Sequence, residues 1–244
     1  MATEADRPAF YALTPGGARD YLTLLHPPYT AWHLSYVAVG AALSSAFTWD
    51  RFLPTLAAFF LAVGIGAHAL DELSGRPLAT RIPRSVLVAL AVSSIAGAVA
   101  IGVVGAVTVD PWIAVFVAAG GFIVVAYNVE LLGGRFHGDT WFALAWGAFP
   151  VATAYFAVAG RLDAVAAAGA LYGFLGSRAQ RQLSTPVRDV RRRVARVTGT
   201  IERKDGGVEP VTAELLLRGK ERALLSLAGA AVALGVGLVI MRVT

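Results

Sequence analysis

Apolar stretches long enough to cross a lipid bilayer recur along almost the whole chain, and they constrain its fold more than any motif does. A transmembrane helix needs about 20 consecutive, mainly apolar residues. Seven stretches approach or exceed that length: 30–48, 52–70, 86–107, 111–127, 141–159, 162–176 and 223–241. Because backbone polar groups must be hydrogen-bonded inside a bilayer, these stretches predict an all-α, polytopic membrane helix bundle with about seven transmembrane helices.

The amino-acid composition supports the same class. Of the 244 residues, 57% are apolar and only 15% are charged, which is unusual for a soluble domain. The chain has no cysteine, so histidine, aspartate and glutamate remain as the side chains able to bind a metal. The net charge of +5 is explained by asymmetric loops, and we expect no nucleic-acid partner.

The basic residues are distributed very unevenly between the two sides of the predicted bundle. Of the 21 Lys and Arg residues, 18 lie in the N-terminal segment and in the loops after the second, fourth and sixth stretches. Only Arg51, Arg161 and Arg242 lie on the other side. The positive-inside rule therefore predicts a multi-pass protein of the cell membrane with a cytoplasmic N-terminus and an external C-terminus. The first apolar stretch begins too late and is too long for a cleavable signal peptide.

This topology divides the chain into four parts. Residues 1–29 form a cytoplasmic and interfacial segment, 30–177 a six-helix membrane core, 178–222 a basic cytoplasmic loop and 223–244 the last transmembrane helix. Within the loop, VRDVRRRVARV places valines at helical intervals between arginines, as a basic interfacial helix would. We expect anionic lipid to bind there, and a lid over a catalytic site is the alternative.

The first polar cluster follows directly after the second apolar stretch. His68, Asp71 and Glu72 are spaced i, i+3 and i+4, so on a continuing helix they share one face. Ionisable groups at the mouth of a membrane helix usually line a cavity, and an imidazole with two carboxylates can bind a divalent cation. Arg76 and Arg81 follow and suit an anionic substrate. The alternative is a helix end whose charges lie in water.

The second polar cluster follows the fourth apolar stretch. It contains Tyr127, Asn128, Glu130, His137 and Trp141. These side chains form either a second wall of the same cavity or an aromatic belt and a hydrated turn at the membrane surface. All four histidines lie on this cytoplasmic side, whereas Asp50, Asp110 and Asp163 on the other side are expected to cap helices.

The two clusters together resemble the UbiA superfamily of intramembrane prenyltransferases. In that family the second helix ends in an N-D-x-x-D-x-x-x-D motif, followed by a basic T-R-x-R-P-like stretch. Here Ala67-His68-Ala69-Leu70-Asp71 stands at the start of the motif, and Thr80-Arg81-Ile82-Pro83 resembles the stretch. Tyr127 resembles the Tyr-led end of the family's fourth helix, and His26-Pro27-Pro28-Tyr29 resembles its entry into the first helix.

The chain departs from the family pattern at several positions. Only Asp71 keeps its place in the first motif, because Ala67, His68 and Gly75 stand where the family has Asn, Asp and Asp. The second aspartate motif should fall near Ser177–Pro186, where this chain is basic. The family also has nine helices. Arg178 and Arg181 could instead bind a phosphate directly, without a metal.

The resemblance implies an enzyme that acts on a prenyl diphosphate or a related isoprenoid lipid, by prenyl transfer or cyclisation. The catalytic residues it implies are Asp71, Tyr127 and Asn128. Phosphate would be neutralised by Arg76, Arg81, Arg178 and Arg181. A divalent metal, Mg²⁺, would be bound by His68, Asp71, Glu72, Glu130 and His137.

Two other functions remain open from the sequence. The same histidines and carboxylates could form the metal site of a lipid hydrolase or oxidase on this fold. Alternatively, the protein could bind an isoprenoid, a quinone or a partner membrane protein without catalysing a reaction.

Overall fold

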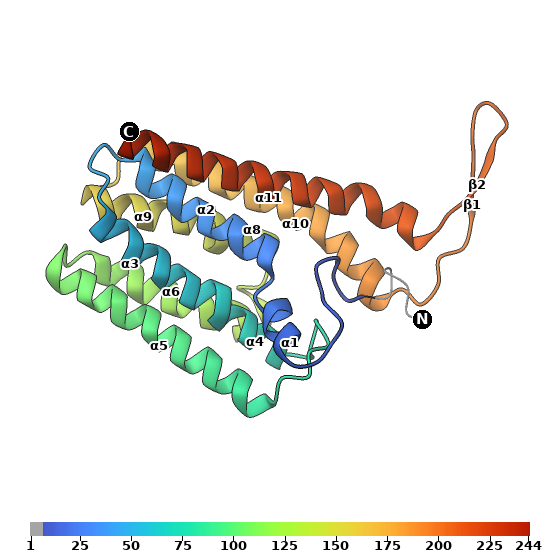
Figure 1. Cartoon of the computed structure of the whole chain (residues 1–244), viewed down its shortest axis with the longest axis horizontal. Helices are drawn as coiled ribbons and strands as arrows, with labels where there is room; N and C mark the ends of the chain where they lie inside the picture. The colour runs from blue at the N-terminus through green and yellow to red at the C-terminus, as the bar shows by residue number, and fades with distance from the viewer. Residues whose placement is uncertain (1–6) are drawn as a thin grey trace.

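The computed structural model describes residues 7–244, and these form a bundle of long helices that lie roughly side by side (Figure 1). The all-helical class is confirmed in coarse form, with one small hairpin as the exception. Residues 1–6 of the expected N-terminal segment lie outside the described part. The helices that precede α5 are α1 Ala18–Leu24, α2 Pro27–Leu43, α3 Trp49–Phe59, the π-helix η2 Phe60–Ala67 and α4 His68–Leu73. The later helices are α5 Arg84–Thr108, α6 Ile113–Asn128, α7 Leu131–Gly134, α8 Asp139–Ala143, the π-helix η3 Leu144–Ala148, α9 Phe149–Ala159, α10 Ala164–Arg193 and α11 Ala213–Val243.

Four helices within residues 7–244 are long and apolar enough to cross a membrane. They are Trp49–Leu73, which joins α3, η2 and α4; Arg84–Thr108; Asp139–Ala159, which joins α8, η3 and α9; and Ala213–Val243. The other three apolar stretches correspond to α2, α6 and the first half of α10. α2 and α6 are shorter, with 17 and 16 residues. The expected count of seven transmembrane helices is therefore not confirmed.

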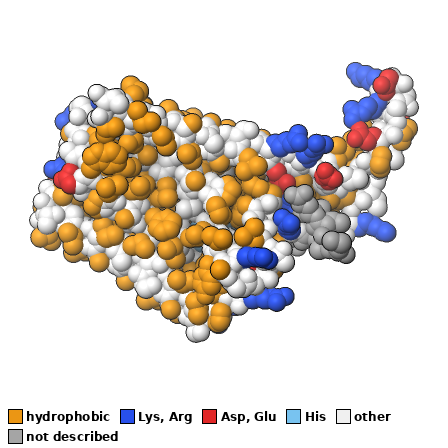
Figure 2. All heavy atoms as spheres, viewed as in Figure 1, with side chains coloured by type: hydrophobic (Ala, Val, Ile, Leu, Met, Phe, Trp, Pro, Cys, Tyr) orange, Lys and Arg blue, Asp and Glu red, His pale blue; other side chains and the backbone are white. Residues whose placement is uncertain are grey.

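The surface of the bundle is apolar along its length and charged at one end. Figure 2 shows hydrophobic side chains over the body of the bundle, whereas most visible Lys and Arg side chains gather at one end and on the hairpin. We call this end, which holds α1 and α4, the basic end, and the opposite end, where α2 ends and α3 begins, the far end. Large apolar side chains such as Val107, Phe122 and Met241 point outward. Such contiguous apolar surface is typical of a protein that contacts lipid.

Glycine contacts bring the helices of the core close together. Gly147 of η3 faces Gly173 of α10, and a Cβ atom on either residue would collide with the backbone of the other. Small residues allow membrane helices to approach in this way. Both π-helices interrupt long helices in the core, and such segments occur frequently at functional sites.

The expected basic loop 178–222 is mostly regular structure. α10 continues through Arg193, α11 begins at Ala213, and the antiparallel strands β1 Thr200–Glu202 and β2 Val208–Pro210 form a hairpin between them that projects from the bundle (Figure 1). α10 extends this far because Val187 and Val190 pack against the hydrophobic core formed by α2, α9 and α11. The valine spacing thus belongs to a helix that packs on the protein itself.

Candidate functional site

A polar cavity of about 720 Å³ lies at the basic end. The N-terminal segment, α2, η2, α4, α6 and α10 all contribute to its walls. It collects residues that are distant in sequence. Its ionisable or hydrogen-bonding lining includes Tyr11, His26, His33, His68, Asp71, Tyr127, Asn128, Glu130, His137, Gln180, Arg181, Arg188, Arg192 and Arg193. We call it the polar cavity.

All four histidines of the chain line the polar cavity. Three of them share one arrangement, in which Nδ1 lies within hydrogen-bond distance of a backbone carbonyl. The pairs are His33 with Trp146 at 2.8 Å, His68 with Gly64 at 3.1 Å and His137 with Tyr127 at 3.0 Å. Because a carbonyl oxygen only accepts, Nδ1 carries the hydrogen, and Nε2 of the neutral ring keeps its lone pair.

His26 is placed differently. Its Nδ1 lies 2.7 Å from the hydroxyl of Tyr11, its ring stacks on His68 at 4.0 Å, and its buried Nε2 has no partner among the described residues. Burial, with a smaller contribution from His68, lowers the pKa of His26 well below its ordinary value. The backbone of His26 is left-handed, with φ at 46°, which is costly for a non-glycine residue and is typical of functional sites.

Three arginines of α10 form the positive wall of the polar cavity. Arg181, Arg188 and Arg192 are spaced i, i+7 and i+11, so they share one face of the helix. Arg181 pairs with Asp139 at 2.9 Å and lies over the ring of Phe142. Arg188 is bonded only to the hydroxyl of Thr185, at 3.3 Å, and no carboxylate of residues 7–244 lies within ion-pair distance of it.

Arg188 is the arginine of this wall whose charge has no ion-pair partner among the described residues. Burial, together with the positive charges of Arg181 and Arg192, lowers the pKa of the Arg188 guanidinium below its ordinary value. A half-buried guanidinium that has no counter-charge among the described residues is costly unless an anion binds to it. The wall is therefore suited to a multiply charged anion such as a diphosphate.

Asp71 and Glu72 have separate environments, although they are neighbours in sequence. Asp71 lines the polar cavity, and no hydrogen bond or ion pair to its carboxylate exists within the described chain. Glu72 is 1% exposed and accepts hydrogen bonds from the backbone of Leu78 and from the backbone and hydroxyl of Thr80, at 3.0, 2.9 and 2.8 Å. His68, Asp71 and Glu72 all lie on α4, but only His68 and Asp71 line the polar cavity, because the loop after α4 folds back around the Glu72 carboxylate.

Three of the four arginines expected to bind phosphate lie elsewhere. Arg76 donates to the carbonyl of Thr80, the backbone of Arg81 donates to Asp20, and Arg178 donates to the hydroxyl of Thr140. None of them lines the polar cavity, whereas Arg181 does. Arg188 and Arg192 were expected at a lipid surface, but they line the polar cavity. Their spacing of seven and eleven residues from Arg181 is the sequence signal that could have placed them on the same helix face as Arg181.

Tyr127, Asn128, Glu130 and His137 of the second polar cluster line the polar cavity, whereas Trp141 does not. The Tyr127 ring stacks on His137 with ring centroids 4.4 Å apart, and its buried hydroxyl has no partner among the described residues. The Asn128 amide donates to the carbonyl of Val124 at 2.7 Å, so part of its hydrogen-bonding capacity is used. Glu130 lines the cavity as well. Despite this gathering, residues 7–244 contain no group of three or more His, Asp and Glu side chains placed to share a metal ion.

An apolar chamber of about 560 Å³ adjoins the polar cavity. α3, η2, α5, α6 and α9 surround it, and its lining is almost entirely aliphatic and aromatic. Val63 of η2 and Trp146 of η3 line both spaces, so the two meet at these side chains. Asp50 and Arg51 lie at the other limit of the chamber, near the far end. The two spaces are thus adjacent, one polar and one apolar, and we refer to them together as the amphipathic site.

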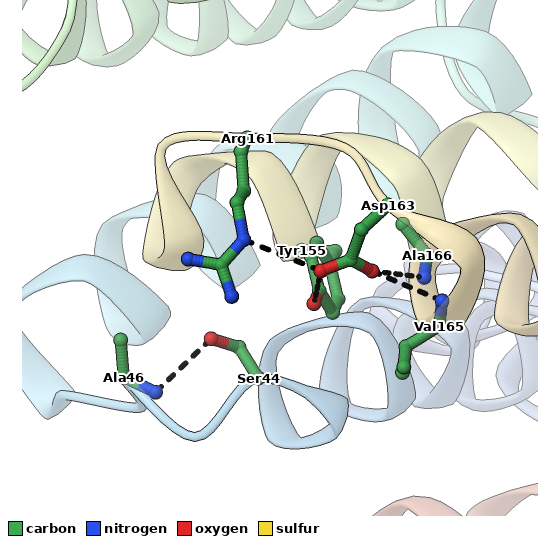
Figure 3. A network of polar contacts seen from close by, with 7 residues as sticks. All are labelled: Ser44, Ala46, Tyr155, Arg161, Asp163, Val165 and Ala166. Atoms are coloured by element: carbon green, nitrogen blue, oxygen red, sulfur yellow. Dashed lines mark hydrogen bonds and ion pairs between the residues drawn. The ribbon is translucent and has the colours of Figure 1, made fainter.

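The far end contains a structural network of polar side chains. Asp163 accepts hydrogen bonds from the backbone of Val165 and Ala166 and from the hydroxyl of Tyr155, and it pairs with Arg161 (Figure 3). The hydrogen bond from Tyr155 is the main reason that the pKa of Asp163 is lowered. The prediction that Asp163 caps a helix is confirmed, since it begins α10.

Comparisons of the chain with protein-family models, with curated proteins and with solved structures found no match. The function proposed below therefore rests on the geometry of the site and on the sequence motifs.

Proposed function

We propose that the chain is a UbiA-like, multi-pass enzyme of the cell membrane that acts on a prenyl diphosphate or a related isoprenoid lipid by prenyl transfer or cyclisation. One observation carries the proposal: the polar cavity holds the half-buried guanidinium of Arg188, which has no ion-pair partner among the described residues, and this cavity shares Val63 and Trp146 with an adjacent apolar chamber. A prenyl diphosphate has the matching shape, with a diphosphate head and a long apolar tail. In this proposal the basic end faces the cytoplasm, as the distribution of Lys and Arg favours.

The head of the substrate would bind to the positive wall. The diphosphate oxygens accept hydrogen bonds from Arg181, Arg188 and Arg192. These arginines stabilise the negative charge that develops on the oxygens as the bond breaks between the diphosphate and C1, the prenyl carbon attached to it. C1 then lies where the two spaces meet, beside Trp146. The rings of Trp146 and Tyr127, with centroids 5.6 Å apart, can stabilise the allylic cation through their π-systems. The apolar chamber excludes water from the cation and its tail.

The expected divalent metal fits this site with a single protein ligand instead of the five that the sequence suggested. Mg²⁺ is commonly bound by one or two carboxylates together with substrate phosphates, without a full protein cage. Asp71 lines the polar cavity with its carboxylate unpaired in the described structure, so we propose it as the protein ligand. Glu72 is excluded from this role by its hydrogen bonds to Leu78 and Thr80. When bound, Mg²⁺ would neutralise part of the negative charge on the diphosphate.

Anionic lipid remains a proposed partner at the basic end. Arg196 and the hairpin residues Arg203 and Lys204 lie beyond the end of α10 and are exposed. Arg191, in contrast, is buried in an ion pair with Glu221 of α11, and Arg192 donates to the carbonyl of Pro8. Lipid contact would therefore involve the hairpin and Arg196 and would leave the arginines of the polar cavity to the substrate.

The proposal is tested by comparing three ligands on the purified, detergent-solubilised protein. We expect geranylgeranyl diphosphate to raise the melting temperature, and geranylgeraniol or inorganic diphosphate alone to raise it much less, because each fills only one of the two spaces. Release of diphosphate with formation of a prenylated or cyclised product would then separate an enzyme from a binding protein. Equal stabilisation by the alcohol and the diphosphate would contradict the proposal.

A further inference from the structure

Three histidines of the polar cavity have fixed Nδ1 atoms, so their Nε2 atoms keep a lone pair, and α10 contributes arginines to the same cavity. We call the part of the cavity that the histidines line its histidine side. His33 has the most informative position among them. It is 6% exposed, and its Nδ1 donates to the carbonyl of Trp146, the residue at which the polar cavity and the apolar chamber meet. Its ring lies 6.0 Å from Phe142 and 6.5 Å from Trp146 between centroids. Among the described histidines, His33 is the one whose Nδ1 is bonded to Trp146, beside which C1 is proposed to lie.

Two further side chains at the cavity have unused hydrogen-bonding capacity. The Tyr127 hydroxyl and the Nε2 atom of His26 are buried and have no partner within the described chain, and their residues are 6% and 8% exposed. Buried polar groups in native structures normally have partners. These atoms therefore indicate a polar ligand that reaches the histidine side of the cavity in addition to the anion at the arginines.

In the tautomer that carries its hydrogen on Nδ1, as His33, His68 and His137 do, the Nε2 atom accepts hydrogen bonds and cannot donate them. The histidine side of the cavity thus selects a ligand group that carries a hydrogen, such as a hydroxyl, a phenol or an amine, and disfavours an ether or ester oxygen. A further anionic head would be drawn to the arginines, where the diphosphate already binds. The arginines and the histidines therefore favour two different ligand groups.

We infer that the histidine side of the polar cavity is a subsite for an acceptor with an O–H or N–H group, and that His33 is its general base. This inference rests on the proposed function. The C1–O bond of the prenyl diphosphate breaks, and its electron pair leaves on the diphosphate. A lone pair of the acceptor oxygen or nitrogen forms the new bond to C1. The proton of that atom passes to Nε2 of His33, which becomes an imidazolium while its Nδ1 hydrogen remains on the Trp146 carbonyl.

The acceptor subsite is tested first on the wild-type protein. The protein is saturated with geranylgeranyl thiolodiphosphate, which occupies the site without releasing its head, and is then titrated with 4-methylphenol or with its methyl ether while tryptophan fluorescence is recorded. We expect the phenol to bind about tenfold more tightly than the ether, since only the phenol can donate a hydrogen bond. Equal affinities would overturn the inference, whatever the variants show.

The role of His33 is tested with the variant His33→Gln and the control Tyr172→Phe, a residue of α10 that lines neither space. With geranylgeranyl diphosphate and 4-methylphenol, we expect His33→Gln to form the prenylated product roughly a hundredfold more slowly, while its affinity for the thiolodiphosphate stays unchanged. A wild-type rate in His33→Gln would remove His33 as the base. Failure of the wild-type protein to bind the thiolodiphosphate would instead refute the proposed function, and the acceptor subsite with it.

Discussion

At the residue scale, Asp71 and Glu72 show how a loop assigns different roles to neighbouring carboxylates. The chain reverses at Gly75, and the backbone N–H groups of Leu78 and Thr80 surround Glu72. Asp71 is left facing the polar cavity. Spacing along a helix could not reveal this, because the helix ends at Leu73 and the partners of Glu72 belong to the following loop.

Asp71→Asn should fold normally and lose the Mg²⁺-dependent part of ligand binding. The amide keeps the volume of the side chain and removes the charge that a hard cation requires. The measurement is the shift in melting temperature caused by geranylgeranyl diphosphate, with and without Mg²⁺. A shift in Asp71→Asn that still grows on addition of Mg²⁺ to the same extent as in the wild type would show that the metal binds elsewhere.

Glu72→Gln should behave in the opposite way. The new amide group brings an NH₂ toward backbone donors, so the variant should be less stable by about 1–3 kcal/mol in the free energy of unfolding. Its affinity for geranylgeranyl diphosphate, measured below the melting temperature, should remain that of the wild type. Unfolding by titration with a denaturing detergent gives the first quantity. If the variant kept its stability but lost ligand binding, Glu72 would be a ligand-binding residue and this assignment would be wrong.

His26 gives the protein a pH dependence of definite sign. Its pKa in the folded protein lies well below the ordinary 6.5, so below pH 6.5 the unfolded chain binds the proton first. The stabilisation that depends on a neutral His26 is therefore complete above pH 6.5 and declines as the pH falls below it. We expect melting temperatures recorded from pH 7.5 to 5.0 to fall less steeply in His26→Gln than in the wild type. Parallel curves would contradict this assignment.

At the element scale, the apolar chamber depends on the helix that joins α3 and η2. Ala58 lies on its chamber side, five residues before Val63, or roughly 7 Å along the helix axis. Ala58→Trp would fill the chamber beyond that point. Because each buried CH₂ contributes about 0.8 kcal/mol, the affinity for geranylgeranyl diphosphate should fall at least tenfold, and that for the shorter geranyl diphosphate much less.

The matched control for the chamber is Ala57→Trp, since Ala57 is exposed on the same helix and does not line the chamber. Affinities of both variants for the two diphosphates can be measured by tryptophan fluorescence or calorimetry. Equal losses for long and short substrates, or equal effects of the two variants, would show that the tail does not enter the chamber.

The position of the apolar helices can be predicted from the sequence, whereas the position of the distal part of α10 cannot. All seven apolar stretches lie largely in helices, because long apolar runs leave few alternatives once they must avoid water. The distal part of α10 was harder to place, since alternating valines and arginines fit both a lipid surface and a protein groove. Contacts of Val187 with the core settle its orientation, and they turn Arg188 toward the cavity. Only tertiary packing contains that information.

At the scale of the whole molecule, charge and apolar surface are separated along the bundle. Apolar side chains cover its length, and most basic side chains gather at the basic end (Figure 2). The amphipathic site repeats this separation inside the molecule, with the arginines at the basic end and the apolar chamber extending toward Asp50 at the far end. A lipid substrate could thus enter with its head and tail already in the orientation that it has in the membrane.

The central claim is that one site binds the diphosphate head with Arg188 and the tail in the apolar chamber. The most direct measurement is the affinity of wild-type protein, Arg188→Gln and the far-end control Arg161→Gln for geranylgeranyl diphosphate and for geranylgeraniol. Because Arg188→Gln removes a hydrogen bond from a charged donor, we expect it to weaken binding of the diphosphate about tenfold to a hundredfold and to leave binding of the alcohol unchanged. Arg161→Gln should change neither affinity. Equal affinities of wild-type protein and Arg188→Gln for geranylgeranyl diphosphate would contradict the account.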